Sequence, residues 1–325
     1  MQPELDRRIP RRPGITSTRI EEDKAEILSG TFQGRTTGAP ITMIVQNKDV
    51  DPQPYERFRD IPRPGHADYP ARVRYGGFND YRGGGRFSGR MTVALVMAGA
   101  IAKKLLASIG IEILAYALSI GNVSSEKDPA REELRRVVYT TSVRCGDREA
   151  APLMEKAILE AAEVGDSLGG IVRAIAYDVP PGIGEPLFDS LDSELAKALF
   201  NIPAVKGVEF GSGFDAARSR GSLNNDPLVV KDGKVQFETN RAGGVLGGLS
   251  TGREIVLQVA FKPTPSIRRK QSSVNVVSME ETELELTGRH DPCVVPKAVP
   301  VVEAVVSIVL ADFMIRSGRI PKILE

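Results

Sequence analysis

The longest apolar stretches of the chain predict buried helices. Apolar residues occur on nearly every face of residues 91–108 and of residues 298–316, so neither segment has a broad polar side. Gly110 and Gly318 follow these segments and are suitable helix-terminating residues. Helices of this kind must be covered on two sides, which requires further layers of structure around them.

Other segments show the patterns of half-buried helices and strands. Helices are expected over residues 147–163, where Leu153 and Ile158 are among the apolar positions, and from Ser190, a suitable N-cap, to Leu199. Apolar and β-branched runs predict strands at 41–46, 170–179, 206–210, 254–260 and 282–286.

The order of these elements favours an α+β fold with a layered architecture. Strand pairs flank the helices, and there is no regular β-α-β alternation, which argues against a doubly wound parallel sheet. No segment is long or polar enough to act as a linker, so residues 1–325 are expected to form a single domain.

Composition narrows the classes of function. The 43 Lys and Arg residues nearly balance the 42 Asp and Glu residues, so no overall charge favours nucleic acid or an anionic membrane. Cys145 and Cys293 lie far apart without metal-binding spacing and are expected to be reduced thiols. The N-terminus lacks a signal-peptide pattern, and the most apolar segment, 299–310, is too short to span a bilayer and contains Glu303. A cytoplasmic protein without a metal site is expected.

The strongest candidate site is the segment 63–90, which places six arginines around His66 and a triple glycine at 83–85. Glycine lets backbone N–H groups approach a phosphate closely, and guanidinium groups bind phosphate or carboxylate through two hydrogen bonds. The alternative is an ordinary surface network in which aspartates neutralise the arginines and His66 is structural. The arginines are Arg63, Arg72, Arg74, Arg82, Arg86 and Arg90, and the aspartates are Asp60, Asp68 and Asp80.

Two further segments could carry chemistry. Residues 288–293 (GRHDPC) bring Arg289, His290 and Asp291 together between a strand and the last helix, and such mixed charges are common in active sites. A helix-entry turn is the alternative, and the local pattern alone favours it. Residues 240–252 (NRAGGVLGGLSTG) contain glycines that permit close backbone passage beside a flat ligand, or simply a turn packed on a helix.

A glycine pattern at residues 211–216 is misleading. The sequence GSGFDA fits the dinucleotide-binding pattern G-x-G-x-x-A after an expected strand. The residues that follow, ARSRGSLNND, cannot form the long helix that such a site needs. No P-loop motif occurs either, so a dedicated NAD(P)-dependent oxidoreductase is not expected.

Nine motifs, in order along the chain, resemble those of the chorismate synthase family. They are ELDRR, EILSGTFQGRTTGAPI, RPGHAD, DYRGGGR, AGAIAKK, GDSLGG, NRAGGVLGGLSTG, KPTPSI and GRHDPC. The resemblance implies a β-α-β sandwich, with long central helices between antiparallel sheets, assembled as a homotetramer. It also implies conversion of 5-enolpyruvylshikimate 3-phosphate to chorismate and phosphate by a 1,4-anti elimination that needs reduced FMN. NADPH would enter only as a reductant of the flavin.

The resemblance also implies roles for individual residues. His66 would keep the reduced flavin in the right protonation state, and Asp291 would assist proton handling at flavin N5. The substrate would be bound by Arg8, Arg63 and Arg289. FMN would be bound by Arg86, Phe87, Ser88, Pro203, Ala204, Gly247, Lys262, Pro263, Thr264, Pro265, Ser266 and Arg289.

The sequence differs from the family pattern at its beginning. Family members start with a G-E-S-H-G block that carries an active-site histidine, whereas Met1 already lies at the ELDRR helix. Residues 165–199 resemble this block, with Leu168 in place of the histidine, and indicate an internal pseudo-repeat. Two explanations stay open: a start at an internal methionine of a longer protein, or a truncated, catalytically impaired FMN-binding relative. The family often has an anion-binding arginine near Gly14, for which the candidates here are Arg11, Arg12 and Arg19.

Overall fold

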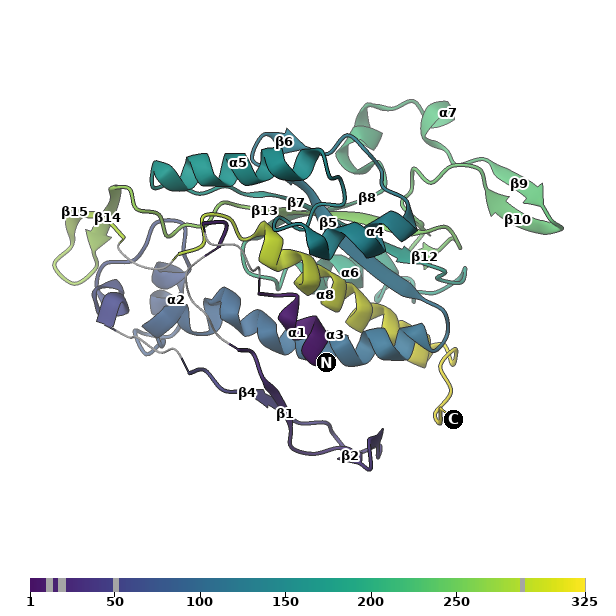
Figure 1. Ribbon diagram of the computed structural model, residues 1–325, viewed down its shortest axis with the longest axis horizontal. Coiled ribbons are helices and arrows are strands. Elements are labelled where there is room, and N and C mark those ends of the chain that lie inside the picture. The colour runs from purple at the N-terminus through teal and green to yellow at the C-terminus, as the bar shows by residue number, and fades with distance from the viewer. Residues whose placement is uncertain (10–13, 17–21, 49–52, 287–289, 325) are drawn as a thin grey trace.

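The fold is built on a five-stranded antiparallel sheet with the strand order β6-β5-β7-β13-β8 (Figure 1). The computed structural model describes residues 1–9, 14–16, 22–48, 53–286 and 290–324. The strands of the sheet are β5 (Glu112–Ile120), β6 (Val123–Ser124), β7 (Gly170–Tyr177), β8 (Val205–Phe210) and β13 (Ile255–Phe261).

One face of this sheet is lined by small and branched apolar side chains. Val172 of β7 lies opposite Ala117 of β5 and opposite Val259 of β13, and all three side chains are buried. Burial alternates along β7 and β13, as expected for strands with one fully covered face. The sheet therefore presents a continuous apolar surface to the helices.

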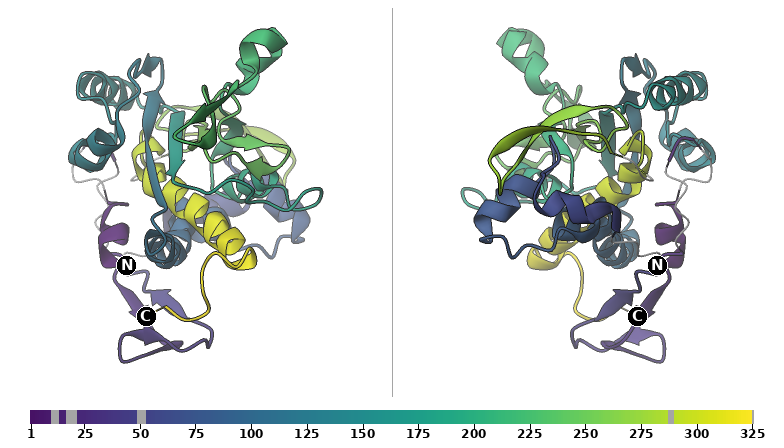
Figure 2. Two further views of the ribbon diagram at one scale, coloured as in Figure 1. Left: turned by 90° about the vertical axis from the view of Figure 1, so that its right-hand side faces the viewer. Right: turned by 90° about the vertical axis from the view of Figure 1, so that its left-hand side faces the viewer.

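The central helix of the fold is α8 (Val295–Arg316). It contacts β5 and β7 on one side, α3 (Thr92–Ala107) on the other, and α6 (Leu191–Leu199) at its flank (Figure 2). The helices α3 and α8 approach so closely that a Cβ on Gly99 would collide with Ala304. This two-sided burial explains why both helices are apolar around nearly their whole circumference.

A small second sheet lies beyond α3, where β1 (Ala25–Ile27) pairs with β4 (Met43–Val45) and β4 contacts α3 (Figure 1). The helices thus lie between a large and a small antiparallel sheet, which agrees with the expected layers. The predicted α+β class is confirmed.

Part of the order of elements recurs along the chain, and the internal pseudo-repeat stays a prediction. Helix α1 (Gln2–Asp6) is followed by the antiparallel pair β1 and β4 and then by the buried helix α3. Likewise α6 is followed by the antiparallel pair β8 and β13 and then by α8.

The remaining elements cover the edges and form hairpins, of which β9–β10 projects from the body (Figure 1). The helices are α2 (Asp68–Arg74), α4 (Arg131–Val137), α5 (Ala150–Glu163) and α7 (Gly221–Asn224), with 3₁₀ turns η1 (Gln53–Arg59), η2 (Arg82–Phe87), η3 (Gly89–Met91), η4 (Val138–Thr140) and η5 (Gly213–Arg218). The hairpins are β2 (Thr31–Phe32) with β3 (Arg35–Thr36), β9 (Leu228–Lys231) with β10 (Lys234–Phe237), β11 (Val245–Leu246) with β12 (Leu249–Ser250), and β14 (Gln271–Asn275) with β15 (Glu280–Leu284).

Most predicted elements occur within a few residues of their expected bounds, with three differences. Leu153, expected in the core, is 57% exposed on α5, where Met154 and Ile158 are buried instead. Sequence analysis missed β5, whose residues are buried on both faces and show no alternation. Among the described residues, α8 alone is long and apolar enough to cross a membrane, because the run 299–310, considered too short to span a bilayer, is part of this longer helix. Of the most apolar 18-residue stretch of α8, 83% is buried inside the protein, and this burial accounts for its hydrophobicity.

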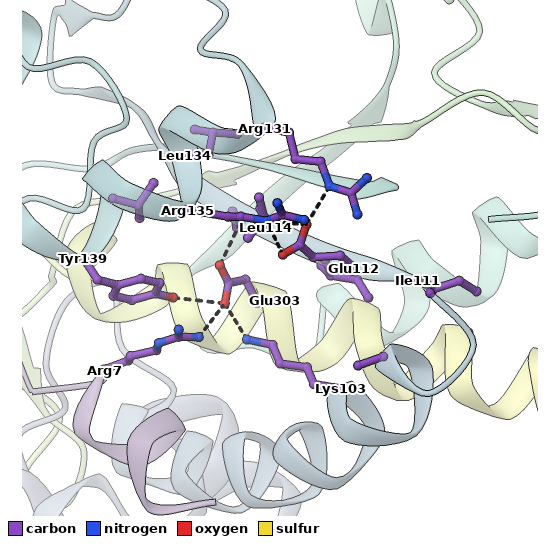
Figure 3. A pocket seen from close by; sticks show the side chains of 15 residues that line it. Arg7, Lys103, Ile111, Glu112, Leu114, Arg131, Leu134, Arg135, Tyr139 and Glu303 are labelled. Atoms are coloured by element: carbon purple, nitrogen blue, oxygen red, sulfur yellow. Dashed lines mark hydrogen bonds and ion pairs between the residues drawn. The ribbon is translucent and has the colours of Figure 1, made fainter. Parts of the chain in front are cut away.

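A buried charge sits in the middle of α8 (Figure 3). The side chain of Glu303 is 1% exposed. Its Oε2 accepts hydrogen bonds from Lys103 Nζ at 2.5 Å and from the Tyr139 hydroxyl at 3.0 Å, and its Oε1 accepts one from the backbone N–H of Ala115 on β5 at 2.9 Å. Lys103 also pairs with Glu4 of α1 at 2.6 Å. One carboxylate therefore connects α8 with α3 and β5 and, through Lys103, with α1.

Neutralising this carboxylate is expected to destabilise the protein strongly. Glu303→Gln leaves Lys103 and Tyr139 without their buried anionic acceptor, and breaking a buried pair from one side costs about 3 kcal/mol or more. Glu160→Gln on α5 is the matched control, since Glu160 and Lys156 are both exposed and such pairs contribute less than about 1 kcal/mol. Urea denaturation measures the free energy of unfolding of both variants. Equal, small losses of unfolding free energy in the two variants would contradict the role assigned to Glu303.

Candidate functional site

Three loops from distant parts of the chain meet around His66: the loop after η1, the triple-glycine turn in η2, and the segment after β13. A Cβ on Gly65 would lie 3.2 Å from the Pro265 Cβ, and the Lys262 ammonium donates a hydrogen bond to the Gly65 carbonyl. A Cβ on Gly84 would lie 3.5 Å from His66 Nε2. The structure thus brings the candidate segment 63–90 together with the KPTPSI motif, which lies far away in the sequence.

Arg63 and Asp68 form a buried ion pair beside His66. Their side chains are 4% and 6% exposed, and the guanidinium donates from Nε to Oδ2 at 2.7 Å and from Nη2 to Oδ1 at 2.8 Å. His66 Nδ1 lies 2.5 Å from Asp68 Oδ1. Burial opposes ionisation of this carboxyl, but the hydrogen bonds and charges of Arg63 and His66 outweigh it and hold the pKa of Asp68 well below its usual range. Asp68 is therefore an anion at neutral pH.

Arg63 is also fixed from its other sides. Its guanidinium lies 4.5 Å from the centre of the Phe58 ring, a cation–π distance. Phe58 belongs to a small buried cluster with Leu284 and Leu286. Arg63 Nη1 lies 3.4 Å from Ser266 Oγ in the segment after β13. Arg63 thus ties the His66 loop to β15 and to residues 262–266, and most of its donors are already engaged.

The triple-glycine turn requires glycine for its own backbone. Gly83, Gly84 and Gly85 have φ values of 61°, 83° and 52°, and a Cβ on Gly85 would collide with the carbonyl oxygen of Asp80. Arg90 closes the turn by donating from Nη2 to the Gly83 carbonyl at 2.9 Å. The turn leads directly into η3 and then α3, so it is anchored to the central helices.

Three of the six arginines in this segment pair with aspartates, as the surface-network alternative predicted. Besides Arg63, Arg72 lies 3.8 Å from Asp60, and Arg82 lies 2.8 Å from Asp80. The other three have no carboxylate within salt-bridge distance in the described part of the chain, and they are Arg74, Arg86 and Arg90. The loops therefore keep a local excess of positive charge.

The segment after β13 offers one buried hydroxyl without a partner and two further polar groups close to it in the sequence. Thr264 Oγ1 is buried and has no hydrogen-bond partner among the described residues. Burial and the nearby charge of Lys206 lower the pKa of Lys262. Ser266 is buried beside Arg63. An unsatisfied buried hydroxyl next to a partly desolvated cation is typical of a ligand site rather than of a structural turn.

The other residues predicted to bind FMN are distributed unevenly. Ala204, which follows Pro203, adjoins the segment after β13, because its carbonyl accepts a hydrogen bond from the Lys262 N–H at 3.0 Å. Phe87 is 36% exposed and the Ser88 hydroxyl accepts a hydrogen bond from the Arg90 N–H at 3.3 Å. Gly247 lies apart from this group, in the turn between β11 and β12 near the start of β13. Its hairpin is bonded to the beginning of β13, where the Val256 N–H donates to the Gly243 carbonyl at 3.0 Å. Lys262 follows the other end of this strand, whose seven residues extend roughly 23 Å.

The GRHDPC segment is described from His290 onwards. Burial and the charge of Arg63 lower the pKa of His290, so this residue is electrostatically coupled to the His66 loop. Asp291 pairs with Lys297 of α8 at 2.7 Å. The Leu168 N–H donates to the Pro292 carbonyl at 2.8 Å, so the GDSLGG motif meets this segment.

Some predicted residues are placed elsewhere or fall outside the description. Arg8 lies just beyond the end of α1, where it pairs with Asp23. Cys145 and Cys293 are buried free thiols, and burial raises their pKa values to about 11 and about 12. Four predicted residues lie outside the described residues: Arg11, Arg12, Arg19 and Arg289.

Sequence analysis overlooked one residue of the site, since Asp68 had been considered only as a surface partner of arginine. His290 had been included in a candidate segment without a role of its own. The signal for Asp68 was its position two residues after His66.

The motifs that meet in space belong to one known family. A sequence model of the family described as chorismate synthase matches residues 1–315. The chain belongs to the chorismate synthase family. Chorismate synthase of Korarchaeum cryptofilum is 54% identical over 315 residues, which cover 97% of this chain and 87% of the relative. Chorismate synthase of Dehalococcoides mccartyi strain BAV1 is 50% identical over 325 residues, which cover 100% of this chain and 89% of the relative.

A solved structure agrees with this assignment. A crystal structure of chorismate synthase matches with a TM-score of 0.74 and 30% identity, covering 97% of this chain and 82% of that chain. The predicted enzyme class, a chorismate synthase of aromatic biosynthesis, is confirmed at the level of the family. Identity of this extent does not favour the alternative of an impaired FMN-binding relative.

Adding one methyl group to the triple-glycine turn of this chorismate synthase is expected to loosen it. Gly85→Ala introduces both an unfavourable φ and a collision with Asp80. In Gly77→Ala, the matched control, the φ of 84° is equally unfavourable but the space around the Cβ is empty. The control should cost about 1–2 kcal/mol, and Gly85→Ala more. Native-state trypsin cleavage after Arg82 and Arg86 should therefore be faster in Gly85→Ala, and equal rates in the two variants would contradict this account.

Proposed function

We propose that the protein catalyses the 1,4-anti elimination of phosphate from 5-enolpyruvylshikimate 3-phosphate, giving chorismate, with reduced FMN as cofactor. The observation that carries the proposal is the convergence of the RPGHAD, GGGR and KPTPS motifs on one positively charged site in a member of this family. The reaction breaks the C–O bond to phosphate and removes a proton from C6.

The residues around His66 fit an anionic flavin and an anionic substrate. The substrate carries two carboxylates and a phosphate, and FMN carries a second phosphate. Arg86 and Arg90, which lack carboxylate partners in the described part of the chain, and Lys262 supply positive charge. The buried hydroxyl of Thr264 is free to donate to a phosphate or flavin oxygen.

When bound, reduced FMN would supply electron density to the substrate. The protein residues bind, orient and handle protons. Backbone groups of the glycine turn and the guanidinium groups of Arg86 and Arg90 hold the anions and stabilise the departing phosphate. His66 faces the turn through Nε2 and is the group that holds or moves a proton there. Arg63, whose donors are engaged by Asp68, supports His66 in this arrangement and was first expected to bind substrate directly.

We further propose a homotetramer in the cytoplasm, with NADPH acting at most as a flavin reductant. Exposed apolar side chains on the projecting hairpin support self-association, since Val230 and Val235 are 77% and 71% exposed. A binding site for nucleic acid or membrane is not part of this proposal.

The reaction is tested by anaerobic phosphate release from 5-enolpyruvylshikimate 3-phosphate with reduced FMN. His66→Ala should lower kcat by a factor on the order of 10²–10⁴ while FMN still binds. Lys262→Ala should raise the Kd of FMN about tenfold or more, the loss of roughly 1.4 kcal/mol of binding energy. Lys156→Ala on α5, where the lysine is exposed, is the control and should change neither value. Absence of phosphate release by the unmodified protein would refute the proposed function.

A further inference from the structure

We propose that Asp68 is a positioning residue that holds the proton of His66 on Nδ1 and so assigns Nε2 as the nitrogen that exchanges protons with bound ligand. The catalytic consequence rests on the proposed function, but the assignment of the proton does not. Asp68 touches neither the glycine turn nor the segment after β13 through any described contact, so it acts through His66 and Arg63.

The hydrogen bond between the two side chains determines the tautomer. His66 Nδ1 and Asp68 Oδ1 are 2.5 Å apart, and the two side chains are 15% and 6% exposed. Asp68 is an anion and can only accept hydrogen bonds. The hydrogen between the two atoms therefore belongs to Nδ1, in the neutral and in the charged imidazole alike. A carboxylate bound to one ring nitrogen fixes both the tautomer and the orientation of the ring.

Asp68 can perform this role because hydrogen bonds from Arg63 fix the orientation of its carboxylate. Besides His66, Oδ1 accepts a bond from Arg63 Nη2, and Oδ2 accepts bonds from Arg63 Nε and from the Arg63 backbone N–H at 3.0 Å. The carboxylate is held in one plane by two side-chain bonds and one main-chain bond. Its charge also compensates the guanidinium, whose Nη2 lies 3.0 Å from His66 Nδ1 and 3.3 Å from Nε2.

The other nitrogen of His66 points to where ligands are expected. A Cβ on Gly84 would lie 3.5 Å from Nε2, so this atom faces the triple-glycine turn. Glycine at this position leaves the nitrogen accessible. Nδ1 is thus bound to Asp68, whereas Nε2 has the glycine turn and, at 3.3 Å, Arg63 Nη2 as its neighbours.

The proton position can be observed directly by ¹⁵N–¹H correlation spectra of protein labelled in its imidazole nitrogens. The chain contains two histidines, so His290→Gln identifies the signals of His66. The unmodified protein should show His66 protonated at Nδ1. In Asp68→Asn this pattern should be lost, and kcat should fall on the order of 10²-fold or more with a smaller change in KM, as expected when a histidine is left in the wrong tautomer. Asp80→Asn, the same substitution at an aspartate that pairs with Arg82, should leave the His66 signals unchanged.

Two results would overturn the proposal: Nε2–H as the main tautomer of His66 in the unmodified protein, or retention of the Nδ1–H pattern in Asp68→Asn. The first measurement needs no variant and remains decisive if Asp68→Asn fails to fold. Asp68→Glu, which keeps the carboxylate, should preserve Nδ1–H and recover part of kcat. Failure of phosphate release by the unmodified protein would refute the proposed reaction alone, because the spectra do not depend on it.

Discussion

The close packing of α3 against α8 is the constraint on which the rest of the structure depends. Gly99 and Ala304 leave no space between the two helices, and the sheet covers the opposite side of α8. Both helices begin on the same side of the molecule (Figure 1). The glycine turn leads into α3, and the HDPC segment leads into α8. The rigid helix pair therefore fixes two of the segments that make up the site.

Two buried ion networks of similar composition stabilise different parts of the structure. Glu303 joins α8 to its neighbours in the core, whereas Asp68 joins Arg63 to His66 at the site. In each, one carboxylate accepts bonds from a cation, a backbone N–H and a further side chain. Burial makes such charges costly unless every partner is present. The networks therefore favour one arrangement of the surrounding loops and helices over all others.

The sequence predicted the buried helices, most strands and the motifs of the site, because these depend on local apolar patterns and on glycine. It did not reveal β5, since a strand covered on both faces has no alternation to detect. The sequence also did not distinguish the buried aspartate from the exposed ones. Asp60 and Asp80 are surface partners of arginine, as expected, but Asp68 is buried and bound to His66, and only the folded loop distinguishes the three. The motif around Gly247 was equally compatible with a turn packed on a helix, and Gly247 is separated from Lys262 by the length of β13.

Helix α8 follows every strand of the five-stranded sheet in the sequence, and this order has a consequence for biosynthesis. A ribosome releases β5 and β7 well before residues 295–316, yet both strands pack part of their apolar surface against that helix. Until α8 has been synthesised, this apolar surface stays uncovered, and a chain in that state is prone to aggregation. The contacts that complete the core join residues nearly two hundred positions apart, such as Ala115 and Glu303, and such long-range closure is slow. The core of this enzyme can close only after α8 has been made.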